Sequence, residues 1–333
     1  MVLKKEEKSI KENKEIGQEN LDQEEKKKRV KKKKTPQGSR WTILFLFLMT
    51  LGTIGAVYLK TNFLPLWQKW TAPLVITGNK SAVKFDTTLI LKKIRNLTQN
   101  TEGKYGFYVY RFQDKKSYGS YEDEVFPAAS LMKLPVIICF YKEVEKGFLD
   151  PETKYILQEK DKVGGAGILH NKKSGSAYSY QQLIEYMGQY SDNTAFKVIR
   201  RVLGDKKIQE TINDLGMKKT SLLEFETSPQ DIGFLFQKVY QGTVINEFYQ
   251  SEFLRILTKT AYEDWLPANL PQGIKVAHKI GKDQGTFSDG GIIFASQPYI
   301  LVVISKEAKE DEANKILPAI SYSVWEWENS SFL

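Results

Sequence analysis

The sequence predicts an α+β domain preceded by a single transmembrane helix. Residues with β-strand character lie near both ends of the region that follows residue 84, and helical periodicity fills the sequence between them. A sheet completed by both ends of a segment, with helices from its middle, is typical of an α+β domain. A charge-free apolar run upstream predicts the transmembrane helix. With 333 residues, of which 41% are apolar, the chain can build a sizeable core.

Residues 1–40 form a strongly basic tail. They hold 14 Lys and Arg against 8 Asp and Glu, which leaves only +3 of the chain's formal charge of +9 for the other 293 residues. The charge is concentrated in "KKKRVKKKK", residues 26–34. A nucleic-acid-binding domain would be expected to carry a basic face on its folded part, so no nucleic-acid partner is expected.

Residues 41–59, "WTILFLFLMTLGTIGAVYL", contain no charged residue. As a helix they would span roughly 28 Å, about the thickness of a bilayer core. A cleaved signal peptide is the alternative, but the apolar run is longer than a usual signal core and no A-x-A-like site follows. The cations before the span predict a cytoplasmic N-terminus, a single-pass anchor in the cell membrane and an extracytoplasmic domain. Residues 41–59 and the basic tail would then contact membrane lipid.

The region after the span divides into a linker, residues 60–83, and one domain, residues 84–333. The linker contains Pro65, Pro73 and Gly78 and has no clear period. The domain shows helical periodicity in 84–97, in 130–146, from 179, from 193, from 228 and in 311–327, and strand character in 105–112, 275–281, 290–296 and 299–305.

Helix boundaries are also marked in the sequence. Ser179 and Ser228 are expected to be N-caps, while Gly204 and Gly242 are expected to stop helices.

Cysteine and histidine are scarce. Cys139 is the only cysteine, which excludes an intrachain disulfide or thiolate cluster, and it falls in an apolar run where a buried thiol is expected. Only His170 and His278 are present, so a His-rich metal site is excluded and a Ser-His-Asp triad would need one of these two. No metal or cofactor is expected.

The stretch "FPAASLMKLP", residues 126–135, places Ser130 three positions before Lys133 at the start of an apolar helix. On a helix the two side chains share a face. A serine hydroxyl needs a neighbouring base to act as a nucleophile, and a lysine amine can serve if burial and nearby cations lower its pKa. The alternative is an ordinary helix N-cap.

Two later motifs carry further polar groups. "YSDN", residues 190–193, puts Ser191 and Asn193 at a break between two helices, where a hydroxyl could relay a proton and an amide could bind a carbonyl. "HKIG", residues 278–281, sets Lys279 on a strand before Gly281, which lets a ligand approach the backbone. Each motif alone is weak.

Together these motifs resemble those of the serine β-lactamase and penicillin-binding-protein superfamily, and of class A β-lactamases in particular. S-x-x-K opens an apolar helix, S-D-N follows 61 residues later, and K-x-G lies on a strand 88 residues after that. The stretches "FPAAS", "GAGIL", "YSDNTA" and "SPQD" also look like that family. The resemblance covers about residues 84–328. It implies an antiparallel sheet flanked by helices together with an all-helical subdomain.

The resemblance also implies roles for individual residues. Ser130 would be the acylated nucleophile, Lys133 its partner in proton transfer, and Ser191 the donor to the leaving nitrogen. Asn193 would hold the amide of the substrate, and Lys279 would attract the carboxylate of the substrate. The backbone N–H groups of Ser130 and Lys282 would form the oxyanion hole.

This sequence departs from the family at two places. Ile280 replaces the hydroxyl residue of the usual K-T-G or K-S-G, which removes a hydrogen bond to a substrate carboxylate. The family's E-x-x-L-N loop is shortened. Glu226 aligns with its general base when counted from "SDN", whereas counting back from "SPQD" leaves almost no loop; the alternative for Glu226 is a surface residue before a helix.

We therefore expect a membrane-anchored extracytoplasmic serine hydrolase, acylated at Ser130 by a β-lactam or a peptidoglycan-like amide, with impaired deacylation. The alternative is a catalytically weak or inactive binding or scaffold protein that keeps the fold at the cell envelope.

Overall fold

The computed structural model of the protein describes residues 86–330. The basic tail, the transmembrane helix expected at 41–59 and the linker at 60–83 lie outside these residues. The described residues belong to one compact unit. No helix among the described residues is long and apolar enough to cross a membrane.

The described residues form an α+β domain. The helices are α4 (Thr88–Thr98), α5 (Lys133–Glu145), α6 (Tyr180–Gln189), α7 (Asn193–Leu203), α8 (Asp205–Asp214), α9 (Pro229–Tyr240), α10 (Glu247–Thr258) and α11 (Glu310–Ser330). Short 3-10 helices are η2 (Ala129–Met132), η3 (Glu159–Asp161) and η4 (Leu169–Asn171). The strands are β1 (Lys104–Arg111), β2 (Ser117–Ser120), β3 (Phe126–Pro127), β4 (Lys154–Ile156), β5 (Ala177–Ser179), β6 (Glu226–Thr227), β7 (Lys275–Asp283), β8 (Thr286–Phe294) and β9 (Tyr299–Lys306).

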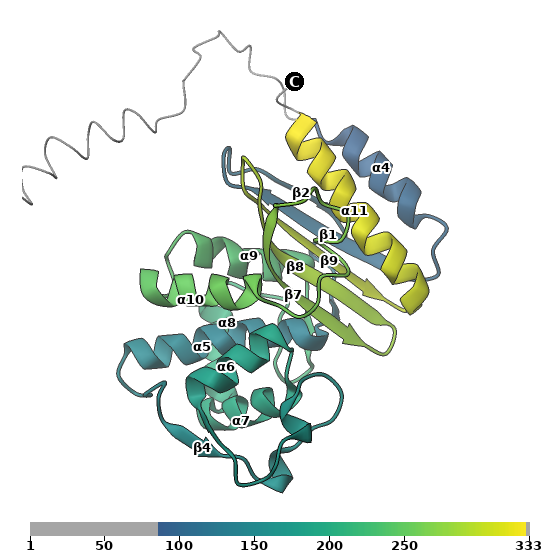
Figure 1. Cartoon of the computed structure of the whole chain (residues 1–333). Helices are drawn as coiled ribbons and strands as arrows, with labels where there is room; N and C mark the ends of the chain where they lie inside the picture. The colour runs from purple at the N-terminus through teal and green to yellow at the C-terminus, as the bar shows by residue number, and fades with distance from the viewer. Residues whose placement is uncertain (1–85, 331–333) are drawn as a thin grey trace, which may run out of the picture. The chain divides into compact units, whose positions relative to one another are not determined.

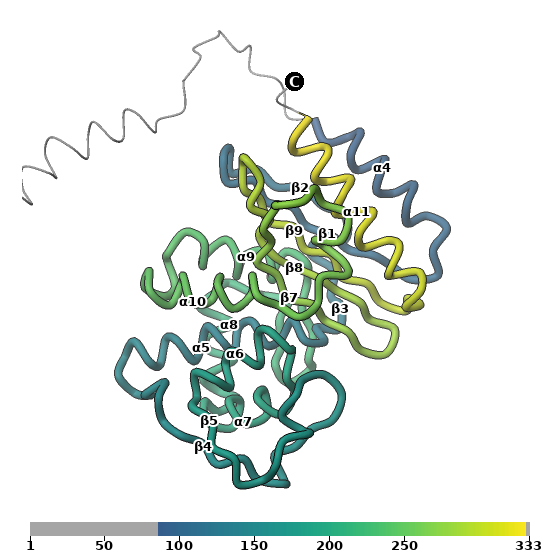
Figure 2. Tube along the Cα trace, viewed as in Figure 1, coloured from purple at the N-terminus to yellow at the C-terminus, as the bar shows by residue number. Residues whose placement is uncertain are grey.

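The main sheet has five strands in the order β2-β1-β9-β8-β7, and every neighbouring pair is antiparallel. Strand β1 from the start of the domain pairs with β9 from its end, with Phe107 opposite Val303. The prediction that both ends of the domain complete one sheet is therefore confirmed. It also brings α4 and α11 side by side, as the blue and yellow segments in Figure 2 show.

Each face of the sheet packs on its own hydrophobic cluster. On β1, Phe107 and Val109 belong to the cluster that contains the buried residues of α4 and α11, while Tyr108 and Tyr110 belong to the one that contains those of α9. Alternate residues of a strand point to opposite faces, and the six inner residues of β1 are all buried because both faces of the sheet are covered (Figure 1).

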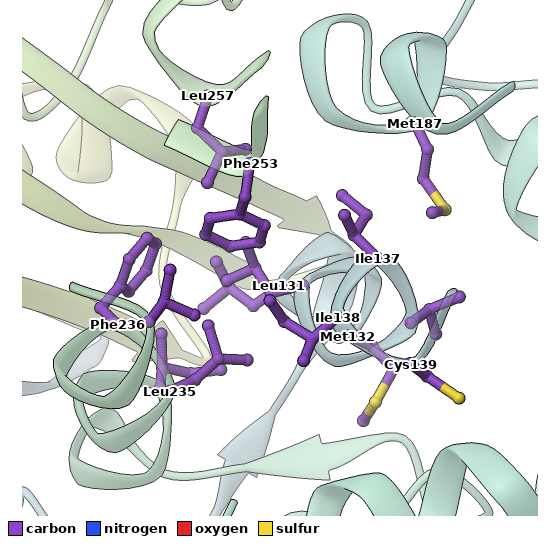
Figure 3. Close-up of a cluster of buried hydrophobic side chains, with 14 of the residues drawn as sticks. Leu131, Met132, Ile137, Ile138, Cys139, Met187, Leu235, Phe236, Phe253 and Leu257 are labelled. Atoms are coloured by element: carbon purple, nitrogen blue, oxygen red, sulfur yellow. The ribbon is translucent and has the colours of Figure 1, made fainter. Parts of the chain in front are cut away.

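Helix α5 is the centre of the helical part of the domain. Ten of its thirteen residues are buried, so it is apolar on all sides rather than on one stripe. Ile137 and Ile138 pack among side chains from α6, α9 and α10, including Met187, Phe236 and Phe253 (Figure 3). The start of α5 is thus held by a closely packed core, which fixes the direction of the side chains at its first turn.

The helix boundaries expected from caps agree with the structure. Ser179 accepts a hydrogen bond from the backbone N–H of Gln182 at the start of α6, and Ser228 accepts one from Asp231 at the start of α9. Gly204 follows the last residue of α7 with a positive φ of 81°.

Helices α8 and α10, the 3-10 helices η3 and η4 and the five short strands β2 to β6 were not expected from the sequence. Helix α8 buries only Ile208, Thr211 and Ile212, and α10 buries three residues as well, so their apolar stripes are too short to stand out. Strand β2 has four residues, of which only one has a buried side chain, so it shows no alternation of apolar and polar residues. It is defined by its pairing with β1.

The two-cluster core predicts a contrast between two leucines. Leu235 of α9 is fully buried, whereas Leu223 is 84% exposed. Leu235→Ala should lower the free energy of unfolding by about 2–5 kcal/mol because it leaves a cavity, while Leu223→Ala should change it by less than about 0.5 kcal/mol. Urea unfolding measures both; equal losses in the two variants would contradict this packing.

Candidate active site

Three separate elements meet at one cavity of about 550 Å³. They are η2 with the start of α5, the turn between α6 and α7, and the edge strand β7. The cavity is lined by Ser130, Gly165, Ala166, Ser191, Tyr262, Ile280, Lys282, Asp283, Gln284, Gly285, Phe287 and Glu310. Each of the three sequence motifs therefore contributes to one site.

Ser130 and Lys133 are in direct contact. Ser130 lies in η2 and Lys133 is the first residue of α5, and the amine Nζ is 2.6 Å from the serine Oγ. The side chain of Ser130 caps neither helix, so the N-cap interpretation does not describe this serine. The residue before it, Ala129, has a positive φ of 45°, a conformation that a non-glycine residue adopts only where its surroundings impose it.

Lys133 also reaches the second motif. Its Nζ is 2.8 Å from Asn193 Oδ1 and 3.4 Å from Ser191 Oγ. Ser191 too has a positive φ, of 54°, which turns its hydroxyl into the cavity from the end of α6. The amine of Lys133 is thus surrounded by oxygen atoms of Ser130, Ser191 and Asn193.

Asp192, between these two residues, has a structural role that the sequence analysis did not assign. Its carboxylate is fully buried and accepts hydrogen bonds from the backbone N–H groups of Ala195, Ile168 and Leu169. One oxygen caps α7 and the other holds the loop that contains "GAGIL". Ser191 and Asn193 are therefore oriented by a buried charge that is itself hydrogen-bonded.

Lys279 approaches from β7 and completes a chain of polar groups. Its Nζ is 2.8 Å from Ser191 Oγ and donates a second hydrogen bond to the carbonyl of Ile280. The side chain is almost completely buried. The polar groups run from Ser130 through Lys133 and Ser191 to Lys279, without a gap longer than 3.4 Å.

Burial changes the protonation of both lysines. Loss of solvation lowers the pKa of Lys133 from 10.5 to about 8, and the negative charge of Asp192 offsets part of this fall. Burial, and then the charge of Lys133, place the pKa of Lys279 well below its ordinary value. A substantial fraction of Lys133 is consequently neutral near pH 8, and a neutral amine can accept the proton of the Ser130 hydroxyl.

Gly281 allows β7 to pass very close to the serine. A Cβ at this position would lie 2.3 Å from Ser288 Oγ and 3.2 Å from the backbone nitrogen of Ser130. The next residue, Lys282, lines the cavity, and its amine forms an exposed ion pair with Glu310. Ile280 lines the cavity as well and offers no hydrogen-bonding side chain there.

Among the described residues, Glu226 is not part of this hydrogen-bonded group. Its side chain is exposed on β6, and it has no hydrogen bond to Ser130, Lys133 or Asn193. Its neighbour Phe225 instead lines a second cavity together with Asn193 and stacks edge-on against Phe196, at 6.0 Å between ring centroids.

The amine of Lys133 lies 5.6 Å from the centre of the Phe196 ring. An aromatic pair, Phe196 and Phe225, therefore lies on this side of Lys133. Neither aromatic residue has a sequence motif of its own, so only the fold reveals them.

Neither histidine is bonded to a serine. His278 is buried beside Lys279, but its Nδ1 is hydrogen-bonded to the carboxylate of Asp289 and its Nε2 has no hydrogen bond among the described residues. His170 Nδ1 is likewise buried without a hydrogen-bond partner in this part of the chain. A Ser-His-Asp triad is thus not formed among the described residues, and the nitrogen in contact with Ser130 Oγ belongs to Lys133.

Tyr262 is a further lining residue that the sequence analysis missed. It lies between α10 and β7, and its hydroxyl donates a hydrogen bond to the carbonyl of Tyr190, the residue before Ser191. A lone aromatic residue in an irregular segment has no periodic signal, which is why the sequence did not point to it.

Comparisons with known proteins agree with this geometry. The model of the beta-lactamase enzyme family matches residues 90–327. Beta-lactamase VEB-1 of Pseudomonas aeruginosa is 23% identical over 273 residues, which cover 71% of this chain and 89% of that protein.

Two solved structures are similar as well. That of PBP-A superposes with a TM-score of 0.69 at 25% identity, covering 73% of this chain and 97% of that one. A mutant of PBP-A, solved as an acyl-enzyme complex with penicillin G, has the same TM-score at 24% identity and the same coverage of both chains.

The buried carboxylate of Asp192 gives a test of how the site is held. In Asp192→Asn only one oxygen remains, so either the cap of α7 or the two bonds to the loop must be lost. The free energy of unfolding should fall by about 1–3 kcal/mol. The control is Asp264→Asn, at an exposed position. Urea unfolding that shows no difference between the two variants would contradict the role given to Asp192.

Proposed function

The chain belongs to the beta-lactamase enzyme family and is a serine hydrolase that forms an acyl-enzyme; from this premise we propose that Ser130 is acylated by a β-lactam or a peptidoglycan-like amide. The observation that carries the proposal is the 2.6 Å contact between Ser130 Oγ and the amine of Lys133, whose pKa burial lowers to about 8. A neutral amine at hydrogen-bond distance is the general base that a serine nucleophile requires.

Acylation then needs one proton to move from the nucleophile to the leaving group. The neutral amine of Lys133 takes the proton of the Ser130 hydroxyl while Oγ forms a bond to the carbonyl carbon of the substrate. As the C–N bond breaks, its electron pair stays on nitrogen, and the hydroxyl of Ser191 supplies the proton. Ser191 regains a proton from Lys133 or Lys279, which lie 3.4 and 2.8 Å away.

The remaining site residues would bind the substrate. Asn193 accepts a hydrogen bond from Lys133 through its Oδ1 and donates one from its Nδ2 to the carbonyl of Gly164. These two bonds fix the position of its side chain beside the nucleophile. The close approach of β7 at Gly281 favours an oxyanion hole formed by the backbone N–H groups of Ser130 and Lys282. Lys279 would lend positive charge to the same region.

We propose that hydrolysis of the acyl-enzyme is slow. Among the described residues, the hydrogen-bond partners of Lys133 are two hydroxyls and an amide, and none is a carboxylate. Phe196 and Phe225 lie beside the amine on the side of Asn193. An aromatic ring cannot take a proton from water, so neither of these two residues can serve as the general base for deacylation.

We further propose that the domain works outside the cytoplasmic membrane, attached by residues 41–59. The support for this location comes from the sequence: the charge-free run follows a basic tail, as in a single-pass protein with a cytoplasmic N-terminus. Such a position would give the domain access to peptidoglycan-like amides.

Mass spectrometry of the full chain, purified in detergent and mixed with benzylpenicillin, tests the proposal. The protein should gain the mass of one penicillin at Ser130, and Ser130→Ala should gain none. After free penicillin is removed, the adduct should persist for hours, because no carboxylate among the described residues is hydrogen-bonded to Lys133 to activate water. Glu226→Gln should leave the lifetime of the adduct unchanged.

Two outcomes would change this account. If wild-type protein forms no adduct with a β-lactam or an activated ester while Ser130→Ala unfolds as cooperatively as wild type, the domain is a binding or scaffold protein that has kept the fold. If the adduct forms and then disappears within minutes, and Glu226→Gln prolongs it, Glu226 is the general base and slow deacylation is wrong.

A further inference from the structure

A groove on the far side of Asn193 extends the site in a direction that the proposed reaction does not use. It has a volume of about 580 Å³ and is lined by Val163, Asn193, Phe196, Lys197, Arg200, Arg201, Asp205 and Phe225. We infer that this groove, which we call the α7 groove, binds a carboxylate or similar anionic group carried by the acyl part of the substrate. The inference rests on the proposed acyl transfer at Ser130.

The groove begins at a residue of the active site itself. Asn193 contacts Lys133 through its oxygen and also lines the α7 groove. Gly165, which lines the cavity that contains Ser130, lies on the other side of the same amide, since a Cβ placed there would be 3.1 Å from Asn193 Nδ2. A substrate whose amide is held by Asn193 can therefore extend from the nucleophile into the groove.

Three cations of helix α7 line the groove. Lys197 is four residues after Asn193, and Arg200 and Arg201 follow one turn later, so the cations lie roughly 6–12 Å along the helix axis from the amide. Positions four and seven residues apart fall on one face of a helix. The aromatic rings of Phe196 and Phe225 and the side chain of Val163 provide an apolar wall for the methylene groups of a bound chain.

The charges in the groove are only partly neutralised. Arg200 is held by Asp205 and Arg201 by the buried carboxylate of Asp161. Lys197 has no carboxylate within ion-pair distance among the described residues, and its Nζ donates to the backbone carbonyl of Lys160. The three cations set against the carboxylates of Asp205 and Asp161 leave one positive charge in the groove, that of Lys197.

In the cavity that contains Ser130, acidic lining residues outnumber basic ones. The lining includes Asp283 and Glu310, and the amine of Lys282 is already paired with Glu310 at 2.5 Å. Ile280 adds no hydrogen-bond donor there. The lining of that cavity therefore holds more acidic than basic side chains, whereas the α7 groove on the acyl side has an excess of cations that an additional anionic group of the substrate can use.

Three acylated forms of 6-aminopenicillanic acid provide matched probes. Adipoyl, hexanoyl and 6-aminohexanoyl side chains have six carbons each and end in a carboxylate, a methyl group and an ammonium group. The rate constant for acylation of the full chain, followed by intact mass, should be on the order of two- to fivefold higher for the adipoyl probe than for the hexanoyl probe. The expected gain is small because Lys197 is exposed to solvent, which weakens its attraction for an anion. The ratio should shrink in high salt.

Lys197→Gln should bring this ratio close to one, and Lys197→Glu should reverse it in favour of the 6-aminohexanoyl probe. The matched control is Lys206→Gln, which removes one positive charge from α8 at a side chain that is 92% exposed and lies outside the groove. The control should keep the wild-type ratio.

Binding to Ser130→Ala, measured by calorimetry, separates this inference from the proposed function. If neither probe acylates the wild-type protein, acyl transfer is wrong, while tighter binding of the adipoyl probe to Ser130→Ala would still support an anionic subsite. Equal rates and equal affinities for the adipoyl and hexanoyl probes, or a ratio that Lys206→Gln changes as much as Lys197→Gln, would overturn the inference.

Discussion

The burial of two lysine amines among hydroxyl groups is the constraint on which the site depends. Lys133 and Lys279 are both almost fully buried, and each is hydrogen-bonded to serine oxygens rather than to a carboxylate. A buried ammonium without an anionic partner is costly, so the neutral form is favoured and the pKa falls. The same burial that costs stability therefore favours the neutral amine that the proposed reaction needs at Lys133, and strongly shifted pKa values tend to occur at functional sites.

Packing and hydrogen bonds around the site hold its backbone in conformations that are unusual for these residue types. Ala129, Ser191 and Phe225 all have positive φ although none is glycine, and all three lie at or beside the site. Such conformations persist where packing holds them, here the apolar surroundings of α5 and the hydrogen bonds that Asp192 accepts. Gly281 has no side chain, and a Cβ at this position would clash with Ser288 Oγ at 2.3 Å and crowd the backbone nitrogen of Ser130 at 3.2 Å.

The sequence predicted the parts of the molecule whose signals are local or repeated. The apolar run of α5, the strands β7 to β9 and the caps Ser179 and Ser228 follow from periodicity and capping chemistry. The contact between Ser130 and Lys133 follows from their spacing.

What the sequence did not show depends on pairing across the fold. Strand β2 is defined by its pairing with β1. Phe225, which has a positive φ and lies in no motif, lines the same cavity as Asn193. Glu226 illustrates the difficulty, because the residue that counting placed at the site is exposed while its neighbour lines the groove.

The dependence of the acylation rate on pH tests most directly whether neutral Lys133 is the base. The fraction of neutral amine increases as pH rises through its pKa, so the second-order rate constant for a penicillin should rise with pH and level off above about 8. A rate constant that stays the same between about pH 6 and pH 10, or that rises only near the ordinary lysine value of 10.5, would contradict the account.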